Sequence, residues 1–149
     1  MNYKLRIKKL KNNKEGFVIL FAVTLSSILL AIAMGVSNVA VKEAKFGTSV
    51  RDSNDAFFAA DTAIEYVLFR DKPPTSPYIP IPGTAQTWNE VRSALGVSGT
   101  NCAIVDITKD NRVAPFTTTS VVSRGYNIGD ASCASSNPNR VEREIKINY

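Results

Sequence analysis

Hydrophobic and polar residues divide this chain into segments with different periodicities. The stretch Gly16–Val41 contains no charged residue, and Phe17–Val36 within it is almost entirely apolar. A helix that crosses a bilayer needs about 20 such residues, because each residue advances it by about 1.5 Å through about 30 Å of hydrocarbon. Backbone amides in lipid must be paired within the segment, so this stretch is predicted to be a membrane-spanning helix.

Beyond this stretch charged residues return, while apolar residues still recur every three or four positions. The apolar stripe consists of Phe46, Val50, Phe57, Ala60, Ile64 and Val67. This spacing is typical of an amphipathic helix with one face against a sheet. The pattern predicts one long helix from about Phe17 to about Arg70, or alternatively two helices hinged near Gly35 or Gly47.

The helical pattern ends at Asp71–Gly83, which contains five prolines. Such a proline density disfavours both helix and central strand, so we expect an extended connector or, alternatively, a proline-rich ligand motif. Farther on, Thr87 and Glu90 have the spacing of a helix capping box, and Gly96 fits a helix C-terminus. These signals predict a short helix, with Trp88 as a core anchor or as an exposed binding side chain.

From Cys102 onward the apolar period drops to two. Apolar alternation over 102–108, the Thr- and Val-rich segment 117–126 and the alternating segment 140–149 predict strands, the last of them half-buried and antiparallel. The small polar residues of Asp130–Asn139 predict a loop that contains Cys133. The chain is therefore expected to combine a long N-terminal helix with a β-rich part.

Charge is concentrated before the apolar stretch. Six basic residues and one acidic residue precede Phe17 and account for the whole net charge of +5, because the remainder carries twelve residues of each sign. Basic segments next to a membrane helix stay in the cytoplasm, so we expect Met1–Glu15 to be cytoplasmic and Lys42–Tyr149 to be translocated. The basic character belongs to this leader and does not indicate nucleic-acid binding.

Both cysteines, Cys102 and Cys133, fall in the part that is expected outside the cytoplasm, where disulfides can form. Only one pairing within the chain is possible, so the alternatives are a single disulfide or two unpaired buried thiols. A bridge between them would close a loop of about 30 residues, which contributes about 3.5–4 kcal/mol in the chain-entropy model.

Two cleavage sites are conceivable near the apolar stretch. Ala31-Ile32-Ala33 has the A-x-A pattern of signal peptidase, which would release a small extracytoplasmic binding domain; the same domain could also remain on an uncleaved anchor. The junction Gly16-Phe17, between a charged leader and the apolar run, resembles the processing site of type IV prepilins. In that family a membrane aspartyl peptidase cuts after the glycine, and the new N-terminal phenylalanine is N-methylated.

A second segment extends this resemblance. Arg51–Glu65 is similar to the pattern after the membrane helix of PilX-like minor pilins, where a polar cluster leads into A-x-x-A-A-(D/E)-x-A-(I/L)-E. Together with Gly16-Phe17, the resemblance covers about Lys14 to Arg70. The PilX-like pattern also lacks the glutamate that major pilins carry five residues into the mature chain, and Phe21 stands at that position here.

The resemblance implies an α+β, pilin-like fold in which a long N-terminal helix lies against a small antiparallel sheet. The implied parts are a cytoplasmic leader (1–16), a transmembrane or filament-core half of the helix (17–41), an amphipathic half (42–72) and an extracytoplasmic β-rich part (73–149). The implied function is that of a minor pilin or pseudopilin in a type IV pilus or a related secretion or competence filament.

The same resemblance implies the partners: a prepilin peptidase, other pilin subunits bound through the N-terminal helix, and the cytoplasmic membrane. The subunit would cross that membrane once, with its N-terminus in the cytoplasm, and would reach the cell surface after assembly.

The residues themselves do not indicate catalysis. The sequence has no histidine, no metal-ligand spacing, no phosphate-binding glycine loop and no nucleophile elbow, so neither an enzyme, a cofactor, a metal nor a small-molecule substrate is expected.

Overall fold

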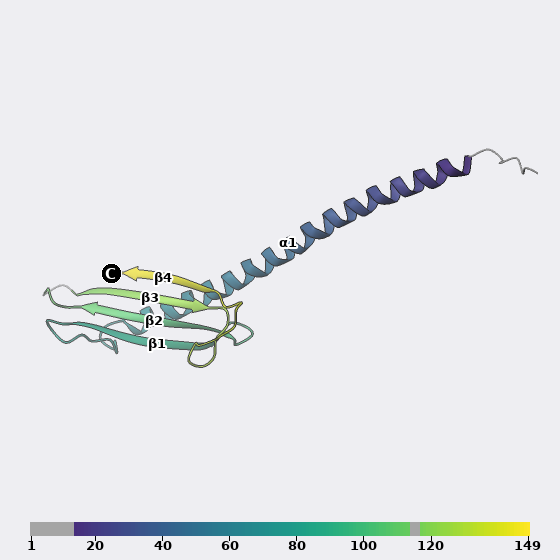
Figure 1. Cartoon of the computed structure of the whole chain (residues 1–149). Coiled ribbons are helices and arrows are strands. Elements are labelled where there is room, and N and C mark those ends of the chain that lie inside the picture. The colour runs from purple at the N-terminus through teal and green to yellow at the C-terminus, as the bar shows by residue number, and fades with distance from the viewer. Residues whose placement is uncertain (1–13, 114–116) are drawn as a thin grey trace, which may run out of the picture. The chain divides into compact units, whose positions relative to one another are not determined.

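The computed structural model describes residues 14–113 and 117–149, so most of the predicted leader, with Lys4 to Lys11, lies outside the described residues. The chain has the predicted α+β composition, with one long N-terminal apolar helix and a four-stranded antiparallel sheet (Figure 1). Its elements are α1 (Lys14–Arg70), β1 (Ala85–Leu95), β2 (Asn101–Asp110), β3 (Thr118–Tyr126) and β4 (Glu142–Asn148). Two compact units divide between Lys45 and Phe46.

Helix α1 is a single element of 57 residues without a break at Gly35 or Gly47, which confirms the single-helix prediction over the two-helix alternative. The helix ends at Arg70, and the N–H of Asp71 still donates to the carbonyl of Val67 at 2.9 Å. Residues 72–83 form neither helix nor strand, as their proline content predicts.

The four strands follow one another in the order β1-β2-β3-β4, and each is antiparallel to its neighbour. Their apolar residues alternate, so that one face of the sheet is buried together with the helix. The buried core contains Ala63, Ile64 and Val67 from α1, Tyr78 from the connector, and Ala103, Val105, Ile107 and Val121 from the sheet. The three sequence-predicted strand regions, in β2, β3 and β4, are confirmed.

The second half of α1 packs on this sheet through small residues and through only the C-terminal half of the predicted stripe, because Ala60, Ile64 and Val67 are buried. Its buried side chains include Ala56, Ala59, Ala60 and Ala63, whereas Phe46 is 72% exposed and Phe57 is 46% exposed. Val50 is exposed as well. The prediction that these three residues face the sheet is therefore wrong. Alanine lets the backbones approach closely, and the Oγ of Ser123 donates to the carbonyl of Ala60 at 2.7 Å.

The predicted short helix with its capping box at Thr87 is also wrong, because this segment is strand β1. Thr87 Oγ1 shares a hydrogen bond of 2.9 Å with Thr108 Oγ1 of β2, and Gly96, with φ of 73°, lies in the turn after the strand. Pairing with β2 overrides the local helix signal. Trp88 packs against the core with its ring 5.9 Å from that of Tyr78, which confirms it as an anchor.

Candidate functional site

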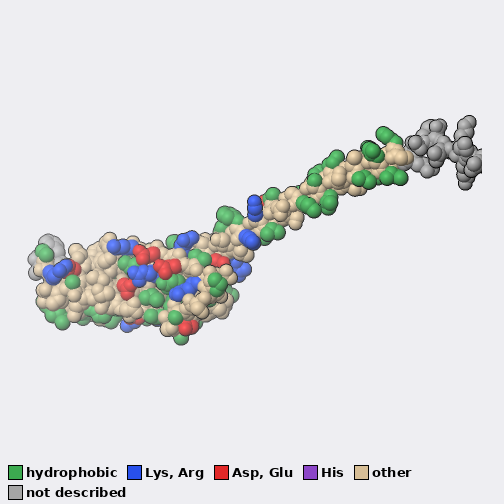
Figure 2. Space-filling view, in the orientation of Figure 1, with side chains coloured by type: hydrophobic (Ala, Val, Ile, Leu, Met, Phe, Trp, Pro, Cys, Tyr) green, Lys and Arg blue, Asp and Glu red, His purple; other side chains and the backbone are tan. Residues whose placement is uncertain are grey.

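The first candidate site is the part of α1 that precedes Lys42. All side chains of Gly16–Val41 are exposed, and Figure 2 shows hydrophobic side chains along this part of the helix. By length and composition α1 is apolar enough to cross a membrane. Exposed apolar side chains on every face are characteristic of a helix that lies in lipid or among partner helices.

Three sequence-predicted site residues lie together at the start of this helix. Gly16 and Phe17 fall in the first turn of α1, and Phe21 follows one turn later. A Cβ built on Gly16 would meet no other atom within 4 Å, so the peptide bond after Gly16 is open on the side of that residue. Phe17 and Phe21 are exposed. Apart from the two chain neighbours and the helix's own backbone, no described atom lies within 4 Å of the Cβ position on Gly16.

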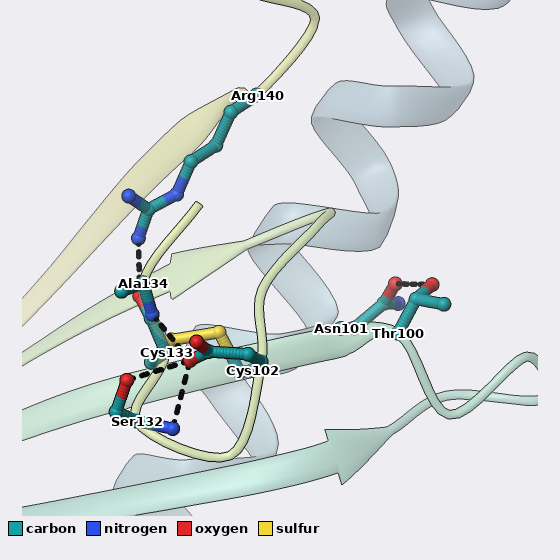
Figure 3. The surroundings of a disulfide bond; sticks show 8 residues. Thr100, Asn101, Cys102, Ser132, Cys133, Ala134 and Arg140 are labelled. Carbon is teal, nitrogen blue, oxygen red and sulfur yellow. Dashed lines mark hydrogen bonds between the residues drawn. A yellow bond between two sulfur atoms is a disulfide. The ribbon is translucent and has the colours of Figure 1, made fainter. Parts of the chain in front are cut away.

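The second candidate site is the loop after β3. Cys102 in β2 and Cys133 form a disulfide with a Cα–Cα distance of 5.5 Å, so the expected pairing is confirmed and the alternative of two free thiols is not (Figure 3). Both cysteines are buried. A Cβ on Gly129 would stand 2.2 Å from the Sγ of Cys102, so only glycine lets the loop close over the bridge.

Hydrogen bonds hold the same loop on both sides of the bridge. The Oδ1 of Asp130 accepts from the backbone N–H of Ser132 at 2.8 Å and from that of Ala134 at 2.9 Å. The guanidinium of Arg140 donates to the carbonyl of Cys133 at 2.6 Å (Figure 3). The same group lies 3.7 Å from the ring centre of Tyr126. These contacts fix the loop at one end of the sheet.

A third cluster was not singled out by the sequence and is centred on Asp71, directly after α1. The carboxylate of Asp71, only 2% exposed, accepts hydrogen bonds from Lys109 Nζ, Ser76 Oγ and Tyr149 Oη at 2.5, 2.5 and 2.6 Å. Burial alone would raise the pKa of Asp71, but these three donors outweigh it and leave the pKa below its ordinary value. The cluster ties the helix end to the connector, to β2 and to the residue after β4.

A neighbouring cluster fastens β1 to the helix. The guanidinium of Arg92 lies 3.8 Å from the ring centre of Tyr66, and Arg70 pairs with Glu90 at 3.5 Å. The hydroxyl of Tyr78 donates to Glu90 at 3.0 Å. Burial, followed by this hydrogen bond to a carboxylate, raises the pKa of Tyr78 to about 12. Here the polar groups satisfy one another, which indicates a structural role.

Over residues 14–113 and 117–149, no three His, Cys, Asp or Glu side chains come together as metal ligands. The absence of catalysis and of a cofactor remains a prediction from the sequence. Comparison with models of protein families, with curated proteins and with solved structures gives no match.

Proposed function

We propose that this chain is a minor pilin or pseudopilin, a structural subunit of a type IV pilus or of a related secretion or competence filament. The observation that carries the proposal is the course of α1. One unbroken helix contains the Gly16-Phe17 junction in its first turn and exposes apolar side chains as far as Val41. It continues to Arg70 as the helix of a disulfide-bonded α+β unit. The resemblance of Arg51–Glu65 to PilX-like minor pilins supports the same assignment.

The proposed mechanism follows from the two environments that can cover the apolar side chains, the membrane and the helices of other subunits. The basic leader holds the N-terminus in the cytoplasm, and the helix from Phe17 to Val41 enters the cytoplasmic membrane. Prepilin peptidase then cuts after Gly16, and Phe17 is N-methylated. During assembly this half of the helix exchanges lipid for the helices of other subunits. Both surroundings are apolar, so van der Waals packing drives the exchange, and the small residues of the helix favour close contact.

Phe21 bears on the place of this subunit in the filament. In major pilins, by the resemblance, a glutamate at this position neutralises the N-terminal amine of a neighbouring subunit, because a carboxylate in hydrocarbon needs a partner. No carboxylate occurs in Gly16–Val41. This chain can present the amine of Phe17 to another subunit but cannot accept one in the same way. We therefore place it at the start or the tip of a filament rather than along the bulk polymer.

The proposal is tested at Gly16. In a host with prepilin peptidase, Gly16→Leu is expected to retain the leader, because a bulky residue before the cut blocks access to the peptide bond. Gly35→Leu is the matched control: this glycine lies in the same helix, and a Cβ there also meets nothing within 4 Å. Normal leader removal from Gly16→Leu, seen as the same mobility as the parent on a gel, would contradict the proposal.

The alternative is a small extracytoplasmic binding domain, either released after Ala33 or held on an uncleaved anchor. The A-x-A pattern at Ala31-Ile32-Ala33 favours release. Against it, helix α1 continues through Met34 and beyond without a break, so the products of such a cut would come from the middle of a regular helix.

A further inference from the structure

A cavity of about 370 Å³ opens between the second half of α1 and the turn that joins β1 to β2. All of its lining lies within the Phe46–Tyr149 unit. The lining includes Arg51, Asp55 and Phe58 of the helix, Val97 of the turn and Asn101 of β2. The volume lies within the usual range of small-ligand sites, about 300–1,000 Å³. We refer to this site as the turn cavity.

One wall of the turn cavity carries a buried amide that lacks a partner. Asn101 is only 7% exposed, and the one hydrogen bond of its side chain is accepted by Oδ1 from Thr100 at 3.5 Å (Figure 3). Its Nδ2 meets no acceptor within residues 14–113 and 117–149 and is not sealed from solvent. A Cβ on Gly96 would stand 2.6 Å from this nitrogen, so the glycine leaves room beside it. A buried donor without an acceptor favours a ligand that brings one.

The helix side of the turn cavity carries one charge of each sign. Arg51 and Asp55 are four positions apart on α1, so their side chains lie next to each other, with Cβ atoms about 5–6 Å apart. Neither side chain makes a hydrogen bond or an ion pair with any residue that the structure describes. A ligand in this cavity therefore meets a cation and an anion side by side.

Apolar surface borders these polar groups. The side chain of Phe58 is 62% exposed, and Val97 is fully exposed in the turn. The ring of Phe58 packs edge-on against the ring of Phe57, with the ring centres 5.9 Å apart, which favours one orientation of the ring. Apolar side chains around a few convergent polar groups are typical of a site for a ligand that is partly apolar.

We propose that the turn cavity binds a zwitterionic α-amino acid with an apolar side chain. The carboxylate of such a molecule accepts hydrogen bonds from the guanidinium of Arg51 and from Nδ2 of Asn101, and its ammonium group donates to the carboxylate of Asp55. One amino acid can reach both charges, because its own two charged groups are attached to the same carbon. Its side chain lies against Phe58 and Val97.

Charge selects this class of ligand over simpler ones. An anion without an ammonium group would place its charge beside Asp55 and leave that carboxylate unpaired. A cation without a carboxylate would do the same to Arg51 and would offer no acceptor to Asn101. The inference goes beyond the proposed filament function, and it holds equally for a released or anchored domain.

The test is calorimetric titration of the full chain, in a nonionic detergent, with leucine and with phenylalanine. Two derivatives of each remove one charged group at a time: the N-acetyl form has no ammonium group, and the amide has no carboxylate. We expect at least one of the free amino acids to bind, and both of its derivatives to bind at least about tenfold more weakly. Equal affinity for the free and the N-acetyl form, or no binding of either amino acid by the folded parent, would overturn the inference.

Two variants connect binding to the named side chains. Asp55→Asn is expected to weaken binding of the free amino acid at least about tenfold and to leave that of the N-acetyl form unchanged, because this form has no ammonium group to lose. Arg51→Gln should likewise weaken the free amino acid but not the amide. Asp61→Asn is the matched control, because Asp61 is a partly exposed aspartate of the same helix that does not line the cavity.

Thermal unfolding shows whether each variant keeps its fold, and if one of the two is unfolded, the other decides. Full binding of the free amino acid by folded Asp55→Asn or Arg51→Gln, or an equal loss in Asp61→Asn, would contradict the assignment. None of these results bears on leader cleavage at Gly16, so this inference and the proposed function can fail separately.

Discussion

Gly125 of β3 lies against Ala56 of α1 so closely that a Cβ on the glycine would stand 2.1 Å from the carbonyl oxygen of Ala56. It would also stand 2.3 Å from the backbone nitrogen of Ala60. These are backbone atoms of a regular helix, which cannot move aside independently. The contact between helix and sheet therefore depends on a residue without a side chain at this point.

Gly125→Ala is predicted to destabilise the Phe46–Tyr149 unit by about 3 kcal/mol, because overpacking of this kind forces the helix away from the sheet. Gly47→Ala is predicted to have the opposite sign and to stabilise by up to about 1 kcal/mol, since Gly47 is helical and a Cβ there meets nothing within 4 Å. Chemical denaturation followed by fluorescence of Trp88, the single tryptophan, measures both. Equal effects of the two substitutions would contradict the packing described here.

Asp71→Asn is predicted to cost about 3 kcal/mol, because it leaves the charge of Lys109, only 12% exposed, without its partner. Asp110→Asn is the control. Its partner Arg112 is 66% exposed, so solvent screening leaves this pair only a small contribution to stability. Denaturation midpoints of the two variants at neutral pH compare the losses directly. Similar losses would show that the Asp71 cluster is not a buried ion pair in solution.

The same carboxylate predicts a pH dependence. The pKa of Asp71 in the folded chain is lower than the ordinary aspartate value of 3.8, so the folded state binds this proton less tightly than the unfolded state does. Its contribution to stability is therefore fully present above about pH 4 and is lost as the pH falls through the lower folded pKa. In Asp71→Asn the free energy of unfolding should fall less steeply as the pH drops below about 4. The same steepness in the variant and the parent would contradict the lowered pKa of Asp71.

The disulfide is predicted to contribute about 3.5–4 kcal/mol, because it closes a loop between residues 31 positions apart. The variant with both Cys102→Ala and Cys133→Ala should unfold at correspondingly lower denaturant than the oxidised parent. Protein taken from its native compartment and unfolded should contain no alkylatable thiol. Two alkylatable cysteines per chain would contradict the pairing.

The sequence predicts an element well where the burial pattern is strong, and less well where contacts between distant residues decide. The alternation in β2 identifies a strand because one face of it is apolar. The apolar run in α1 identifies a membrane-type helix because every face of it is apolar. The segment around Trp88 was predicted incorrectly. Its local capping box resembles a helix start, but pairing with β2 makes the segment a strand. A capping box involves only two side chains, whereas the backbone hydrogen bonds between β1 and β2 extend along the whole segment.

The site residues divide in the same way. Gly16, Phe17 and Phe21 lie close together in the sequence, so a local pattern can propose them as one processing site, which stays a prediction. The two cysteines have only one possible partner each within the chain, and this pairing is confirmed. Asp71 receives its partners from Lys109 and Tyr149, which are 38 and 78 residues away. A single aspartate on a polar segment carries no signal of such partners, and for this reason the cluster could not be predicted.

The proposed place in the filament makes a further prediction. A subunit that lacks a carboxylate at Phe21 can be followed by a glutamate-bearing subunit but cannot itself dock in the usual way, so it should occur at filament tips. Immunogold labelling of intact filaments with antibodies against 46–149 should give label at one end. Label along the whole shaft at every repeat would exclude the tip and indicate a major pilin despite Phe21.

The most direct measurement is the identity of the N-terminal residue of the mature protein, determined by mass spectrometry of its N-terminal peptide after isolation from the host membrane. The proposal predicts a chain that begins with N-methylated Phe17, because cleavage falls between the charged leader and the apolar helix. A mature chain that begins at Met34 would indicate release by signal peptidase, and one that retains Met1 or Asn2 would indicate an uncleaved anchor. Either of those two results would contradict the assignment as a pilin-like subunit.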